Sequence, residues 1–355
     1  MKKIRIQGAR ICIIVMLALG LASWLSFEDA LGSSFREDES TEAGQLRLYL
    51  PMVVNIDEVN TGSKPYTGPP PENPTWLEYT NYFRSLAGLA AVDNNSSWSQ
   101  GDWLHSRYMV KNDFIGHSED PGNTWFSSEG DLAARTSNLL VSTSHTASDL
   151  AAIEGWIQAP FHGVGILDPQ LQQVGFGSFR EQDGGFQSGA ALDVLRGLGE
   201  QPDRVQYPIA WPGDGASVPI TSHTGEYPNP LSSCSGYSSP AGLPIILQIG
   251  PGEETPQVTF HSFRMGNLEL PHCIFDETSY NNPDHSAESL GRAILNSRDA
   301  IVLIPKEPLI TGNTYAVSIT VNGATHIWSF SITNEKSTTN SALAVHDAGW
   351  QFSLP

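Results

Sequence analysis

The chain has 355 residues, and its 19 Lys and Arg residues against 38 Asp and Glu residues give a formal net charge of −19 at pH 7. A charge of that sign and size excludes a nucleic-acid backbone or an anionic lipid surface as the default partner. Charged residues are only 16% of the chain, whereas 33 Gly and 24 Pro make turns frequent, so length and composition together favour a loop-rich extracellular protein of two domains over a helical cytosolic enzyme.

The first 32 residues have the features of a secretory signal peptide. Basic residues between positions 2 and 10 precede an apolar run at 11–25, and Ala30-Leu31-Gly32 follows it. The run is shorter than the roughly 20 residues of a stable membrane-spanning helix. We therefore expect cleavage, which leaves a secreted or cell-surface protein with no membrane span; an uncleaved anchor is the alternative. Residues 33–72, charged and then rich in Pro and Gly, are expected to form a flexible tether.

Residues 73–183 carry the periodicity of a first, partly helical domain. Asn73 and Pro74 suit the N-cap and first position of a helix, and Thr146 with Asp149 suits a capping box. The expected elements are helices at 73–88, 99–113 and 148–158 and a strand at 174–179.

Several short motifs follow one another between residues 74 and 180. They are NYFRSLAGL, WLHSRYMVKNDFIGHSEDP, RTSNLL, AIEGWIQAPFHGVGILDP and QQVGFGSF. In this order they resemble the CAP superfamily, also called the SCP domain, of secreted cysteine-rich, venom-allergen and plant pathogenesis-related proteins, in its bacterial form. The resemblance implies an α-β-α sandwich around a mostly antiparallel sheet.

Members of this superfamily often carry two His and two Glu in a central groove, a tetrad proposed to hold a divalent metal. His117 and His162 match the two histidines, and Asn138 matches an Asn beside the first Glu. Ser137 stands at the first Glu position and Ala159 at the second. The resemblance thus implies that the two imidazoles face one groove, and two imidazoles alone make a weak site for a divalent metal such as Zn.

Other carboxylates near these motifs could replace the missing ones. Glu119, Glu129 and Glu154 are the candidates, and Glu129 lies in the SSEGD segment that leads toward Ser137. The simpler interpretation is that they are solvated loop carboxylates. Glu129 and Glu154 are kept with Ser137 and Asn138 as candidate groove residues.

The sequence favours binding over catalysis, although it leaves the question of enzymatic activity open. It has no Gly-x-Ser-x-Gly elbow around a nucleophilic serine. The leading hypothesis is a secreted protein that binds a lipid, peptide, glycan or protein ligand around His117 and His162, with no required cofactor. The alternative is a metal-dependent hydrolase in which both histidines and a recruited carboxylate hold Zn and activate water.

A second domain is expected at residues 205–335, after a linker at 184–204. Short apolar runs alternate there with Pro and Gly turns, which is typical of an antiparallel sandwich. The best hairpin has Asn322-Gly323 at its turn, and the run before it resembles a pattern of bacterial immunoglobulin-like domains. Residues 336–355 are expected to be a tail. The fold class is therefore α+β: a CAP-type sandwich followed by an all-β immunoglobulin-like sandwich.

Cysteine usage agrees with export. Cys12 lies in the expected signal peptide, which leaves Cys234 and Cys273 as the cysteines of the mature chain. An oxidising compartment predicts a disulfide between them. Two buried free thiols are the alternative, since a metal site would need more ligands of this type nearby.

Overall fold

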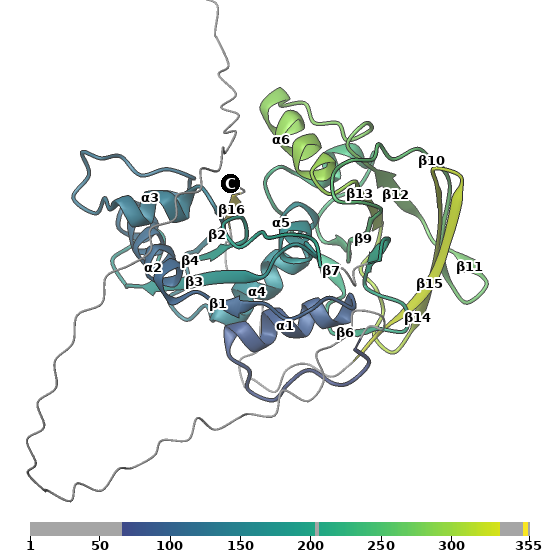
Figure 1. Ribbon diagram of the computed structural model, residues 1–355, viewed down its shortest axis with the longest axis horizontal. Helices are drawn as coiled ribbons and strands as arrows, with labels where there is room; N and C mark the ends of the chain where they lie inside the picture. Colours follow the sequence, from purple (N-terminus) through teal and green to yellow (C-terminus); the bar gives the residue numbers. More distant parts are fainter. Residues whose placement is uncertain (1–65, 203–205, 334–350, 354–355) are drawn as a thin grey trace, which may run out of the picture. The chain divides into compact units, whose positions relative to one another are not determined.

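The computed structural model of the chain describes residues 66–202, 206–333 and 351–353 (Figure 1). All of them belong to one compact unit, residues 55–355. The expected signal peptide, most of the expected tether and most of the expected tail lie outside the described residues. Among the helices that are described, none is both long and apolar enough to span a membrane.

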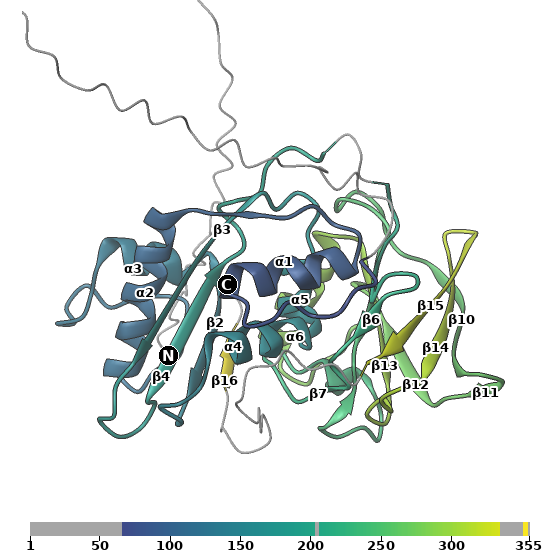
Figure 2. The ribbon, with the colours of Figure 1, turned by 90° about the horizontal axis from the view of Figure 1, so that it is seen from below.

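The N-terminal part of the described chain is a five-stranded sheet between two layers of helices. The strand order is β1-β3-β4-β2-β16, with β1 and β3 parallel and the other neighbours antiparallel. Helices α2 and α3 cover one face of the sheet, and α1, α4 and α5 cover the other (Figures 1 and 2). The elements are α1 (Trp76–Leu86), β1 (Asp93–Asn94), α2 (Ser96–Lys111), α3 (Ser128–Ala134), β2 (Ser137–Ser142), α4 (Asp149–Ile157), α5 (Pro160–Ile166), β3 (Gln173–Arg180), β4 (Ser188–Asp193) and β16 (Gln351–Ser353). This is the α-β-α sandwich that the sequence predicted.

Strand β3 shows why both helical layers fit against the sheet. A Cβ atom at Gly177 would lie 2.1 Å from the backbone nitrogen of Trp103, so glycine lets α2 approach the strand closely. Phe176 points to the opposite face, where its ring packs 5.1 Å from that of Trp76 and 6.4 Å from that of Trp156. Because glycine and aromatic residues alternate along β3, glycine faces α2 on one side of the sheet and an aromatic ring packs against the helices on the other.

The predicted helix starts differ from the observed ones: α2 begins at Ser96 and not at residue 99, and two predicted N-caps are wrong. The N-cap of α1 is Thr75 and not Asn73, so the predicted cap is wrong. The Thr75 hydroxyl accepts the N–H of Glu78, and the Glu78 carboxylate accepts the N–H of Thr75 at 2.8 Å, which forms a capping box. Helix α4 is likewise capped by Ser148 and not by Thr146. In both cases the hydroxyl nearest the helix satisfies the first free N–H groups.

Residues 184–204, which were expected to be a linker, contain a central strand. Strand β4 pairs with β2 on one side and β3 on the other, so the sheet continues beyond residue 183. Its sequence, SGAALD, has few large apolar residues, although every position is buried. A Cβ atom at Gly189 would lie 2.9 Å from the carbonyl oxygen of Ser106 in α2, so small residues are required here. The short strand β16, within the expected tail, pairs with β2.

The C-terminal part contains two main sheets. Their strand orders are β11-β10-β14-β15-β6 and β12-β13-β9-β5, and β7 pairs separately with β8. The strands and one 3₁₀ helix are β5 (Ile209–Trp211), β6 (Ser217–Val218), β7 (Ser222–His223), η1 (Pro230–Ser233), β8 (Ala241–Gly242), β9 (Ile245–Gln248), β10 (Val258–Met265), β11 (Leu268–Glu269), β12 (His272–Phe275), β13 (Ala300–Pro305), β14 (Thr314–Val321) and β15 (Ala324–Ile332).

The predicted hairpin and disulfide are confirmed in this region. Strands β14 and β15 are joined by Asn322 and Gly323 with φ of 49° and 79°, and alternate side chains of β14 are buried. Cys234 and Cys273 form a disulfide with their Cα atoms 5.6 Å apart, which ties the segment after η1 to β12.

One helix was not expected in a region predicted to be all-β. Helix α6 (His285–Asn296) begins after Asp284, whose carboxylate accepts the N–H groups of Ser286 and Ala287. Its buried residues, Ala287, Gly291 and Leu295, recur every four positions, which is the spacing of one helix face.

The hydrophobic core runs without a break from the CAP-like sandwich into the C-terminal sheets. The Phe161 ring of α5 lies 5.0 Å from that of Tyr280 and 6.2 Å from that of Phe275. On another side, the Phe83 ring of α1 lies 5.9 Å from that of Trp211 in β5. The C-terminal part was predicted as a second domain, and with a shared core we expect the two parts to stabilise each other.

Candidate functional site

His162 lies in the first turn of α5, and its side chain is completely buried against Glu226. The imidazole Nδ1 is 2.8 Å from Oε2 of Glu226. The same carboxylate accepts the backbone N–H of Phe161 at 3.2 Å and that of His162 at 3.3 Å. Because a carboxylate only accepts, Nδ1 carries the proton in this contact.

Helix α5 lacks a local cap, which explains the place of Glu226. Its N-cap is Ala159, the position matched to the second tetrad Glu, and Ala159 makes no side-chain hydrogen bond. The first turn of a helix concentrates free N–H groups and a positive partial charge, which favour an anion. Glu226, from the segment after β7, fills this role. The carboxylate beside His162 therefore comes from the C-terminal part of the chain, which the sequence analysis missed.

A second buried histidine lies near this pair. His223 Nδ1 donates to the backbone oxygen of Gln158 at 3.1 Å, and its side chain is fully buried. Burial lowers the pKa of His223, an effect that Glu226 opposes and His162 reinforces. Its Nε2 atom is buried and has no hydrogen-bond partner in the described part of the chain. The lowered pKa favours the neutral form of His223, whose hydrogen bond to Gln158 joins the two parts of the chain.

His117 lies between α2 and α3 and is half-buried. Its Nδ1 atom is 2.5 Å from the carbonyl oxygen of Ala134 at the end of α3, so Nδ1 carries the proton. That His117 and His162 face one groove stays a prediction.

Ser137 and Asn138 point to opposite faces of β2, as neighbouring residues of a strand do. The Ser137 hydroxyl donates to Asp102 of α2 at 2.8 Å, whereas the Asn138 amide donates to the backbone oxygen of His162 at 3.2 Å. Both residues are buried. Burial raises the pKa of Asp102 well above its ordinary value. Of the two, Asn138 thus lies on the His162 side and Ser137 contacts the α2 layer.

The candidate glutamates have separate partners. Glu129 is exposed in the first turn of α3 and accepts a hydrogen bond from the neighbouring serine. Glu154 accepts the hydroxyl hydrogen of Tyr79, and burial together with the charge of Glu154 raises the pKa of Tyr79. Glu119 is buried, with Oε1 3.0 Å from Nδ1 of His105.

The donors present do not fit the two-His, two-Glu metal site. Ser137, at the first Glu position, donates to Asp102, and the side chain of Ala159, at the second, has no donor atom. Over residues 66–202, 206–333 and 351–353, no group of three or more His, Cys, Asp or Glu side chains is arranged to hold a metal ion. A catalytic Zn site uses three protein ligands, so we derive no metal-dependent step from this arrangement.

Comparison with known proteins finds one family model that matches part of this sandwich. Residues 77–191 match the family model of CAP, described as the cysteine-rich secretory protein family. A solved structure of an extracellular protein containing an SCP domain from Bacillus anthracis str. Ames is similar over 33% of this chain and 38% of that chain, with 19% identity and a TM-score of 0.26. The chain thus spans well under half of that protein. No curated protein matches the chain.

Proposed function

Because residues 77–191 form a CAP domain, we propose that the protein is a secreted, non-enzymatic binding protein. Its CAP domain receives a lipid, peptide, glycan or protein ligand at a surface that includes His117. His162 is buried and contributes by its hydrogen bond to Glu226, which holds the first turn of α5. The observation that carries this proposal is the loss of both tetrad carboxylates, because Ser137 and Ala159 stand at their positions.

Both residues have another role in the fold. The Ser137 hydroxyl donates to Asp102 in α2, and Ala159 is the N-cap of α5 and has no polar side chain. A metal-activated water needs at least three protein ligands and an open position on the metal. By contrast, a binding surface needs only a stable scaffold with exposed or half-exposed side chains, such as His117.

One observation favours the second candidate, a metal-dependent hydrolase. A carboxylate on one imidazole nitrogen is the arrangement that orients many metal-binding histidines through the other nitrogen. Glu226 stands in that relation to His162. The hydrolase would therefore use His162 and His117 as ligands with a further carboxylate, and Glu226 as the orienting residue.

Calorimetric titration of ZnCl₂ into the full secreted chain separates the two candidates. For a binding protein we expect weak heat or none, and the same result in a His117→Ala, His162→Ala double variant. His145→Ala, in a half-buried loop position before α4, is the matched control. Tight zinc binding that is lost in the double variant but kept in His145→Ala would contradict the proposal and support the hydrolase.

Ligand capture tests the positive side of the proposal. The full chain is immobilised and exposed to arrays of glycans and lipids, and a retained ligand is recovered and analysed for chemical change. We expect an unchanged ligand whose retention falls in His117→Ala but not in His145→Ala. Recovery of a hydrolysed ligand, or equal retention by both variants, would contradict it.

Secretion is part of the proposal. Its support is the basic and apolar pattern of residues 1–32. N-terminal sequencing of the protein recovered outside the cytoplasm should begin shortly after Gly32. Recovery of a chain that starts at Met1 in the membrane fraction would contradict cleavage.

A further inference from the structure

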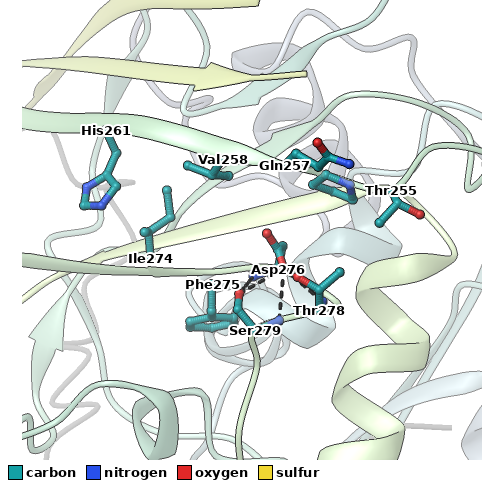
Figure 3. Close-up of a pocket in the computed structure, with 10 residues that line it drawn as sticks. Thr255, Gln257, Val258, His261, Ile274, Phe275, Asp276, Thr278 and Ser279 are labelled. Carbon is teal, nitrogen blue, oxygen red and sulfur yellow. Dashed lines mark hydrogen bonds between the residues drawn. The ribbon is translucent and has the colours of Figure 1, made fainter. Parts of the chain in front are cut away.

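A cavity of about 490 Å³ opens between the start of β10 and the end of β12 (Figure 3). This volume lies in the range of small-molecule sites. The wall from β10 includes Gln257, Val258 and His261, and the opposite wall includes Ile274 and Asp276. The pairing of β10 with β14 shifts register between Val258 and Phe260, and such irregularities often redirect side chains next to a site.

Asp276 is the charged group of this cavity and is held in a fixed orientation. It is 5% exposed. Its Oδ1 atom accepts the N–H and hydroxyl of Thr278 at 2.9 and 2.6 Å and those of Ser279 at 3.1 and 2.9 Å. The other carboxylate oxygen points toward Val258 and Gln257 (Figure 3). One oxygen therefore anchors the loop, and the second faces the cavity.

The surroundings favour a positive charge in this cavity. None of the residues that line it is Lys or Arg. Glu253 and Glu254, just before the lining segment, are exposed, and the chain carries a net charge of −19. His261 lies at one end with Nδ1 2.8 Å from Nε2 of His272. Burial, and then the nearby His272, lowers the pKa of His261, which favours its neutral form.

We propose that this cavity binds a small organic amine, with the protonated nitrogen on the free oxygen of Asp276 and a short apolar body against Val258 and Ile274. A charge-assisted hydrogen bond gives the interaction its strength and direction. The apolar wall removes the carbon chain of the ligand from water. The lining residues all come from the C-terminal part of the chain, and the proposal does not rest on the function proposed for the CAP-like part.

Three probes of matched shape test the proposal on the full chain by NMR titration: n-pentylamine, n-pentanol and n-pentanoate. We expect pentylamine to shift the amide signals of Thr278 and Ser279. Pentanol should bind about ten- to hundredfold more weakly, which is the contribution of a hydrogen bond to a charged group, and pentanoate should not bind. Equal affinity for pentylamine and pentanol, or no shift with pentylamine, would overturn the proposal.

Two variants locate the binding. Asp276→Asn keeps an oxygen for the loop and removes the charge, so pentylamine affinity should fall at least tenfold. Gln257 is exposed, and its backbone N–H donates to Asn322. Gln257→Trp should narrow the entrance of the cavity, and it tests the site even if Asp276→Asn does not fold. Thr259→Trp, exposed two positions along β10 and outside the cavity lining, is the control. Wild-type affinity in Gln257→Trp, or an equal loss in Thr259→Trp, would overturn the assignment.

Discussion

Replacing Glu226 by Ala tests whether a carboxylate from the C-terminal part of the chain holds helix α5. The wild-type carboxylate accepts three hydrogen bonds: from His162 Nδ1 at 2.8 Å and from the N–H groups of Phe161 and His162 at 3.2 and 3.3 Å. Both side chains of the pair are fully buried. The variant would leave a buried imidazole and two helix N–H groups without their acceptor.

The expected loss in the free energy of unfolding is about 3 to 5 kcal/mol. Removing a helix cap costs about 0.5 to 2 kcal/mol, and each buried polar group left unsatisfied costs about 1 to 3 kcal/mol. Breaking a buried pair by removing one partner has a total cost in the same range. Glu226→Gln keeps the shape and one oxygen acceptor, so we expect it to lose about half as much.

Urea denaturation of the full chain, followed by tryptophan fluorescence, measures these losses. With a slope of about 3 kcal/mol per molar urea, the midpoint for Glu226→Ala should fall by about 1 to 1.7 M. Glu254→Ala, an exposed carboxylate of the same type, is the control and should stay near the wild type. A folded Glu226→Ala variant within 1 kcal/mol of the wild type would refute the assignment of Glu226 as the cap of α5.

Three further predictions concern stability. Burial lowers the pKa of His223, so below about pH 6.5 the unfolded chain binds a proton that the folded chain does not bind, until pH passes the lowered pKa of the folded chain. The free energy of unfolding should therefore fall as pH drops through this window. A series of thermal melting curves should show a smaller pH dependence in His223→Gln, and an unchanged pH dependence would contradict the prediction. Burial instead raises the pKa of Asp102, so the folded chain keeps a proton and its stability should fall as pH rises above 3.8. Asp102→Asn should therefore unfold at pH 7 with a free energy at least as high as the wild type, and a large loss there would count against a neutral Asp102. Replacing Cys234 and Cys273 by Ser opens a loop with a sequence separation of 39 and should cost about 4 kcal/mol; because the core is shared, calorimetry should show one lowered transition, whereas an unshifted CAP transition would indicate independent folding.

The sequence by itself determined the features that depend on neighbouring residues. Asn322-Gly323 predicts a tight hairpin because these residues tolerate positive φ, and the alternation around them predicts which side chains are buried. The order of short motifs between residues 74 and 180 resembled the CAP superfamily, and the family model matches residues 77–191. Period-two alternation also places Ser137 and Asn138 on opposite faces of their strand, as their separate hydrogen-bond partners show.

The tertiary structure alone decided the features that join distant segments. Strand β4 is central despite its small residues, because the close approach of α2 leaves no space for larger ones. Glu226 reaches His162 across 64 positions of the chain, and Asp276 faces residues of β10 across a cavity. No local sequence pattern predicts such contacts. The free N–H groups of a helix bind whichever acceptor the packing brings close, and a cavity is lined by whichever side chains the packing places around it.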